Sequence, residues 1–140
     1  MTTDTAGSAA PPKGLHLGAW AAQALLALAF LTAGAMKLAA PLDELAKNMA
    51  WIPHVPGWLV RFIGASEVLG ALGLILPAAT RIKPVLTPIA AALLVVVMVL
   101  GAATHVAIGE AERIVVNAVM GGLAAFVAWA RFKPAAIAGK

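Results

Sequence analysis

One carboxylate in the middle of a long apolar stretch is the side chain best suited to chemistry in this sequence. Glu67 lies within Arg61–Thr80, RFIGASEVLGALGLILPAAT, a segment apolar enough to cross a bilayer. A charged side chain at that depth is costly, so such residues are rare and usually face the protein interior. We therefore expect Glu67 to face a packed interior, where it could move a proton or hold a polar head group.

Glycines accompany this carboxylate at a regular spacing. Gly64, Glu67, Gly70 and Gly73 recur at every third position, so they share one helix face that drifts slowly around the axis. Glycines on such a face allow the backbone of another helix to come close. The pattern predicts tight packing around Glu67.

Four further polar residues lie at the ends of the apolar segments, and the arrangement of spans given below places them at one face of the membrane. They are Lys37, Arg61, His105 and Asn117. With Glu67, they are the predicted ligand-binding residues of an outward-facing polar pocket. Lys37 or His105 is expected to pair with Glu67, because Arg61 lies roughly 240° around the helix from it. The sequence assigns no catalytic residue, but Glu67 and His105 are the best candidates.

Each of these residues also has a purely structural interpretation. Glu67 could fix the helix register through an ion pair or hydrogen bonds. His105 could cap the last turn of its helix, and Asn117 could form a hydrogen bond between helices. Lys37 and Arg61 could be anchors that extend to the membrane surface.

Composition defines the class of protein. The 140 residues are 62% hydrophobic and 11% charged, whereas a soluble domain has about 25% charged residues. The chain is therefore expected to be an integral membrane protein with one domain. Its net charge of +4 comes from basic residues at the ends of apolar runs, as the positive-inside rule places them, which argues against nucleic-acid binding.

Several kinds of site are excluded by residue type. With no cysteine in the chain, disulfide exchange, Cys-ligated zinc and iron–sulfur clusters are ruled out. A bis-histidine haem needs two interior histidines, and only His105 is a candidate, so such a haem is not expected. His16, at the very start of the first apolar run, and His54, between runs, are expected to be solvated. No metal site is predicted, and no cofactor is specified, although a quinone would suit the pocket.

The apolar segments predict an all-α fold, a transmembrane four-helix bundle with a short interfacial helix between the first and second spans. The short helix falls within Pro41–Ala50, where proline is followed by Asp43 and Glu44 in the first turn. The expected organisation is a disordered cytoplasmic tail (1–14), one transmembrane domain (15–133) and a cytoplasmic tail (134–140). The expected spans are Leu15–Met36, Trp58–Thr80, Pro84–Thr104 and Ile114–Ala130.

Four spans place both termini on the same side of the membrane. That side has six basic residues, and the other side has four. Two of the four, Lys37 and Arg61, lie at helix ends and could face the protein interior. The positive-inside rule then puts both termini in the cytoplasm. The expected location is the bacterial inner membrane, as a multi-pass protein.

The chain resembles the DoxX-like family of small four-helix membrane proteins over about Leu15–Phe132. The resemblance rests on Gly34-Ala-Met-Lys37-Leu, on Gly64-Ala-Ser-Glu67-Val-Leu-Gly70, and on the later His105 and Asn117. It implies a role beside other membrane proteins. Some related proteins are membrane subunits of a thiosulfate:quinone oxidoreductase, a mycobacterial relative belongs to a complex with a superoxide dismutase and a sulfurtransferase, and animal relatives act in receptor assembly.

The leading functional hypothesis is therefore a membrane protein whose outward-facing pocket binds a small amphipathic ligand, such as a quinone or a lipid. It would support a redox or stress-response complex, with membrane lipids, redox proteins and a second copy of the chain as candidate partners. One alternative is a non-catalytic assembly or scaffold protein whose polar cluster is structural. Another is a small membrane isomerase that uses Glu67 or His105 for proton transfer.

Overall fold

Helices account for all the regular structure in residues 12–140, the part of the chain that the computed structural model describes. Within this part, four helices are long and apolar enough to cross a membrane: α1 (Lys13–Ala39), α3 (Gly57–Thr80), α4 (Leu86–Ala107) and α5 (Ile114–Phe132). A 3₁₀ turn at Ala111–Arg113 leads directly into α5. The predicted all-α four-helix bundle is confirmed. Most of the expected disordered tail lies outside the described residues, and α1 begins two residues before the expected span.

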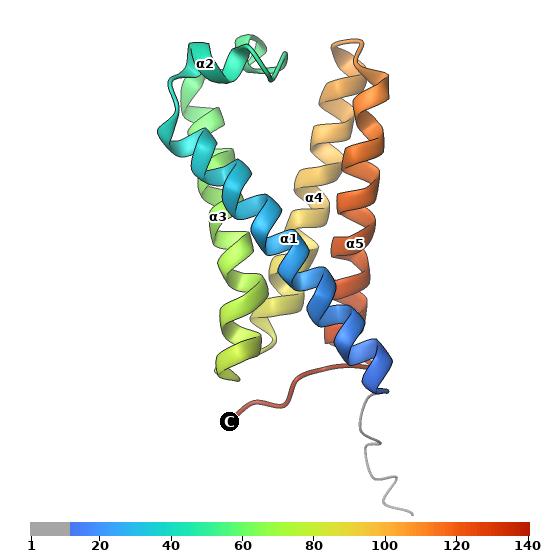
Figure 1. Cartoon of the computed structure of the whole chain (residues 1–140). Coiled ribbons are helices and arrows are strands. Elements are labelled where there is room, and N and C mark those ends of the chain that lie inside the picture. The colour runs from blue at the N-terminus through green and yellow to red at the C-terminus, as the bar shows by residue number, and fades with distance from the viewer. Residues whose placement is uncertain (1–11) are drawn as a thin grey trace, which may run out of the picture.

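The bundle consists of two closely packed helix pairs. α1 packs against α3, and α4 packs against α5, while α3–α4 and α1–α5 contacts join the two pairs (Figure 1). The main core contains large side chains from all four helices, including Leu26, Phe30, Leu74, Leu94 and Val127. Close van der Waals packing of these side chains holds the two pairs together, because lipid tails are as apolar as the side chains themselves.

The two pairs separate toward the end of the bundle that carries α2, called here the α2 end (Figure 1). All the buried residues of α4 lie between Thr87 and Leu94, and all those of α5 lie between Ala124 and Arg131. The halves of α4 and α5 at the α2 end therefore contribute no fully buried side chain. By contrast, α1 and α3 have buried residues along their whole lengths. We call the opposite end of the bundle the Arg131 end.

The predicted short helix is present between the first two spans. α2 (Leu42–Ala46) begins after Pro41 and is followed by a 3₁₀ turn at Ile52–His54. Leu45 and Ile52 bury themselves against Val60 of α3. The helix ends four residues earlier than the expected segment, because the chain turns after Ala46 and so brings further apolar side chains onto this cluster. The small cluster fixes the connection to the start of α3.

The glycines of α3 face two different neighbours. A Cβ added to Gly64 would lie 2.8 Å from the Gly34 carbonyl oxygen of α1, whereas one on Gly70 would lie 2.8 Å from Leu94 of α4. A three-residue step falls roughly 60° short of a full helical turn. Two such steps, from Gly64 to Gly70, therefore turn the glycine face from α1 toward α4. The same three-residue spacing thus allows close contact with both helices.

The C-terminal residues fold back across the Arg131 end (Figure 1). Ala135 is fully buried. The Arg81 side chain donates from Nε to the Ala138 carbonyl at 2.9 Å, and the Lys140 backbone N–H donates to the Arg81 carbonyl at 3.0 Å. These bonds tie the last residues to the turn between α3 and α4.

Candidate functional site

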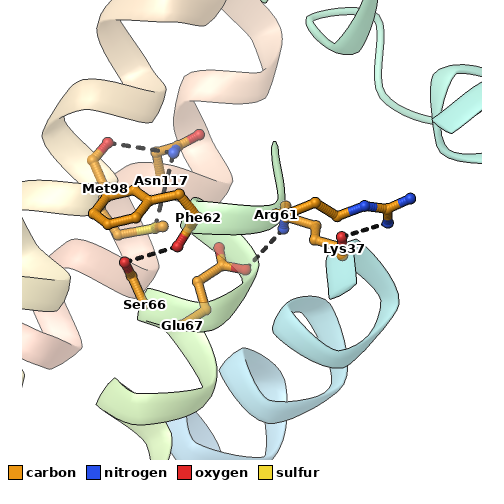
Figure 2. Close-up of polar contacts among 7 residues, drawn as sticks. All are labelled: Lys37, Arg61, Phe62, Ser66, Glu67, Met98 and Asn117. Atoms are coloured by element: carbon orange, nitrogen blue, oxygen red, sulfur yellow. Dashed lines mark hydrogen bonds and ion pairs between the residues drawn. The ribbon is translucent and has the colours of Figure 1, made fainter. Parts of the chain in front are cut away.

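Lys37 and Glu67 form a buried ion pair between α1 and α3 (Figure 2). Lys37 Nζ donates to Glu67 Oε2 at 2.9 Å, and the two side chains are 8% and 5% exposed. Of the two partners that the sequence left open for Glu67, Lys37 is the one that binds it. Gly34 and Gly64, each one turn before a member of the pair, bring the two backbones together. Burial of this kind is favourable only because each charge meets an opposite one.

Arg61 contacts the end of α1 and does not contact the carboxylate. Its Nη1 donates to the carbonyl oxygen of Lys37 at 2.7 Å (Figure 2). The same nitrogen donates to the carbonyl oxygen of Ala40, also at 2.7 Å. The last carbonyls of a helix have no partner within the helix and carry partial negative charge. Arg61 therefore stabilises the end of α1 and holds the backbone of Lys37 in place. It points away from Glu67, as the spacing of six residues predicts.

The ion pair uses only part of its hydrogen-bonding capacity. A lysine ammonium has three donors and a carboxylate has two accepting oxygens. Within residues 12–140, Lys37 Nζ makes one hydrogen bond, and Glu67 accepts only through Oε2. The remaining donors and Glu67 Oε1 are not used within the pair.

His105 lies in a separate cluster at the turn between α4 and α5. Its Nδ1 is 3.0 Å from Glu110 Oε2, and Arg113 Nε is 3.5 Å from Glu110 Oε1. Glu110 thus joins the end of α4 to the start of α5. No role was predicted for Glu110, although an acid five residues after a histidine across a glycine turn is a signal for such a contact. A reaction that needs Glu67 and His105 on one substrate is not favoured by this arrangement.

Asn117 binds α4. Its Nδ2 donates to the Met98 carbonyl at 3.3 Å and lies 3.8 Å from Met98 Sδ (Figure 2). Gly101 leaves room for this amide, because a Cβ there would lie 2.6 Å from Asn117 Nδ2. The contact is the interhelical hydrogen bond that the structural interpretation of Asn117 expects.

The expected convergence of five polar residues is therefore only partly present. Lys37, Arg61 and Glu67 lie together on α1 and α3. By contrast, His105 binds Glu110 in the turn between α4 and α5, and Asn117 binds Met98 of α4. The physical reason is that no buried packing joins the two helix pairs at the α2 end, so these polar groups bind partners within their own pair.

An apolar groove runs beside Asn117 on the surface of α4 and α5. Its volume is about 220 Å³, and apolar side chains make up nearly all of its lining. Lys37 and Glu67 do not line it. Residues on both helices form its walls, among them Val95, Met98, Ala118 and Gly121.

A second buried polar cluster, at the Arg131 end, was not predicted. Gln23 Nε2 donates to the Leu74 carbonyl at 2.6 Å, and Gln23 Oε1 accepts from Arg131 Nε at 2.7 Å. Arg131 Nη1 also donates to His16 Nδ1 at 3.0 Å, so His16 is half-buried and not solvated as expected. His54 is exposed, in agreement with the prediction. The signal for this cluster was Gln23, an amide within an apolar span, together with an arginine inside the last turn of α5.

No group of three His, Asp or Glu side chains suited to a metal ion occurs in the described part of the chain. Within this part of the chain, the groups of the ion pair that remain unused are the other donors of Lys37 and the second oxygen of Glu67.

Four apolar helices, each long enough to cross a membrane and packed into one bundle, define a small multi-pass membrane protein. The family model described as the DoxX-like family matches residues 21–127, and the chain belongs to this family. The matched range contains Lys37, Glu67, His105 and Asn117 but neither His16 nor Arg131. No curated protein and no solved structure matches the chain.

Proposed function

We propose that this DoxX-like membrane protein binds the polar head of a small amphipathic ligand, quinone-like or lipid-like, at the Lys37–Glu67 pair. The observation that carries the proposal is a buried ion pair with unused hydrogen-bonding capacity inside an apolar helix pair. Charged residues within membrane spans usually mark ligand, ion or proton paths. In this role the protein would support a membrane-bound redox or stress-response complex.

The two charged groups would divide the work of binding. Lys37 Nζ would donate to a ligand carbonyl or stabilise a negative oxygen, and Glu67 Oε1 would accept a proton or hydrogen bond from a hydroxyl. Arg61 would act indirectly, by holding the end of α1. The ligand's apolar tail would lie along the halves of α4 and α5 that have no fully buried residue.

The proposed setting is the bacterial inner membrane with both termini in the cytoplasm. Six basic residues lie at the Arg131 end, including the turn between α3 and α4 and the C-terminal tail: Lys13, Arg81, Lys83, Arg131, Lys133 and Lys140. Basic residues are enriched on the cytoplasmic side of inner-membrane proteins. The ion pair would then lie in the half of the bilayer that is further from the cytoplasm.

The proposal is tested by titrating the purified protein in micelles with a short-chain ubiquinone analogue, followed by quenching of the tryptophan fluorescence. Glu67→Gln keeps the shape of the side chain and removes its charge, and it is expected to weaken binding by about tenfold. Glu44→Gln is the matched control, because Glu44 is exposed and bound only to Lys47. Binding by folded Glu67→Gln protein at the wild-type affinity would overturn the proposal.

An assembly or scaffold role is the second candidate. The observation in its favour is the close approach of α1 and α3 at Gly34 and Gly64, directly beside the ion pair. In this case the pair would only fix how the two helices pack, and no ligand would be needed. Loss of stability in Glu67→Gln, without binding of the quinone analogue or co-purified lipid in the wild type, would favour this candidate.

A further inference from the structure

Arg131 is a buried cation whose partners in the described chain are all neutral. It is 4% exposed. Its guanidinium donates to the Gln23 amide oxygen, to the His16 ring nitrogen and to the Ala135 carbonyl at 2.9 Å. The guanidinium carbon lies 5.3 Å from the centre of the Trp20 ring, within the range of a cation–π contact. These contacts use Nε and Nη1, whereas Nη2 makes only a 3.5 Å contact with the His16 carbonyl within the described chain, and no contact neutralises the charge.

No acidic side chain lies near Arg131 in residues 12–140. The carboxylates of this range are at the α2 end, in α2, in the buried pair, or at the turn between α4 and α5. Arg81 and Lys83 lie at the same end as Arg131, in the turn between α3 and α4, and Lys133 follows α5. Within the described chain this end of the molecule therefore has several basic side chains and no acidic side chain. A buried charge without an opposite charge is unfavourable unless one comes from outside.

A pocket borders this arginine. It has a volume of about 210 Å³ and is formed where the folded-back C-terminal residues pass the α3–α4 turn and the end of α5. The lining residues are Pro84, Val85, Arg131, Phe132, Ala136 and Ile137. Arg131 is the one charged residue of this lining, and the pocket lies at the end of the spans.

We propose that this pocket binds a phosphate group, with Arg131 as its main charged contact. A guanidinium forms strong charge-assisted hydrogen bonds with phosphate oxygens, and within the described chain Nη2 is the nitrogen of Arg131 with donors left for them. Basic pockets between transmembrane helices bind the phosphate groups of anionic lipids. The same chemistry would serve a free phosphate ion, and the experiment below separates the two sources. The site is independent of the Lys37–Glu67 pair, which lies toward the other end of the bundle.

The test is native mass spectrometry of the full chain in micelles with equal amounts of phosphatidylglycerol and phosphatidylcholine of the same chain length. The expected result is a 1:1 adduct with a preference of about tenfold for phosphatidylglycerol. The preference should fall close to one in Ala136→Trp, which fills the pocket and leaves Arg131 in place. Arg131→Gln should also lose it, and Ala136→Trp keeps the test valid if Arg131→Gln does not fold.

Lys133→Gln is the matched control, because it removes one charge from the same end without touching the pocket. It should keep most of the preference. The proposal would be overturned if Lys133→Gln and Ala136→Trp lowered the preference for phosphatidylglycerol equally, or if Ala136→Trp kept the full preference. Either result would show that general surface charge attracts the lipid. Displacement of phosphatidylglycerol by inorganic phosphate, with the same dependence on Ala136, would identify the free ion as a second source of the bound phosphate.

Discussion

Gly34 of α1 and Gly64 of α3 lie backbone to backbone. A Cβ on Gly34 would lie 2.7 Å from the Gly64 carbonyl oxygen, and a Cβ on Gly64 would lie 2.8 Å from the Gly34 carbonyl oxygen. Each contact is with backbone, which cannot move aside as a flexible side chain can. This mutual approach sets the distance between α1 and α3 where Lys37 and Glu67 meet.

Alanine at either glycine should therefore push the two helices apart. We expect Gly34→Ala and Gly64→Ala each to lower the free energy of unfolding by about 1–3 kcal/mol, the usual cost of overpacking. Thermal unfolding in micelles, followed by tryptophan fluorescence, measures the effect. Gly122→Ala in α5 is the matched control, since its added Cβ would meet nothing within 4 Å. Equal midpoints for the three variants would contradict the importance of this contact.

Removing one member of the buried ion pair should cost more than removing both. Lys37→Met and Glu67→Gln each leave a buried polar group without its partner. We therefore expect each substitution to lower the free energy of unfolding by about 3–5 kcal/mol. The double variant should be more stable than the sum of the single changes implies. A double-mutant cycle from chemical denaturation in micelles measures this coupling. Strict additivity would mean that the two charges do not interact.

The glycine and charge patterns explain why much of this fold was predictable. Apolar length sets the four spans, and a carboxylate such as Glu67 inside a span indicates an interior face. The helix pairing could not be predicted, because small residues occur on several faces and do not say which neighbour they meet. Gly70 and Gly73 pack on α4, although they share a spacing pattern with Gly64, which packs on α1.

The candidate site was predicted in part for the same reason. The positions of His105 and Glu67 within their spans correctly placed both residues at the same end of the bundle. Two residues at a similar depth in the membrane need not contact each other, however. A nearby carboxylate, Glu110, satisfies His105 within its own helical hairpin. The burial of Arg131 was not predicted, because an arginine at a helix end usually extends to the membrane surface. Its contact with Gln23, 108 residues earlier in the chain, accompanies this burial and could not be read from sequence spacing.

Gln23 of α1 forms hydrogen bonds with both α3 and α5, through the Leu74 carbonyl and the Arg131 side chain. Replacing it with leucine should leave the Arg131 Nε donor without its partner, and we expect a loss of about 1–3 kcal/mol in the free energy of unfolding. Thr32→Val is the control on the same helix, because the Thr32 hydroxyl is exposed and binds only the Leu28 carbonyl. Both are measured by thermal unfolding in micelles. If Gln23→Leu is as stable as Thr32→Val, the buried hydrogen bonds of Gln23 contribute no net stability.

Gly101 and Asn117 should be coupled through the space that the glycine leaves. Gly101→Ala would bring a Cβ to 2.6 Å from Asn117 Nδ2, so the amide must move and give up its bond to the Met98 carbonyl. We expect a loss of about 1 kcal/mol, the usual net value of one hydrogen bond. In an Asn117→Ala background the same substitution should cost much less. A cost of Gly101→Ala that is the same with and without Asn117 would contradict the coupling.

The absence of cysteine makes the orientation of the chain directly testable by single-cysteine labelling. His54 is exposed in the connection at the α2 end, and Lys140 is exposed beyond α5 at the Arg131 end. Because basic residues are concentrated at the Arg131 end, the positive-inside rule predicts that this end faces the cytoplasm. A membrane-impermeant maleimide should therefore label His54→Cys in intact spheroplasts, and it should label Lys140→Cys only after the membrane is permeabilised. The reverse pattern would place the Lys37–Glu67 pair in the cytoplasmic half of the bilayer, and any ligand would then reach it from that side.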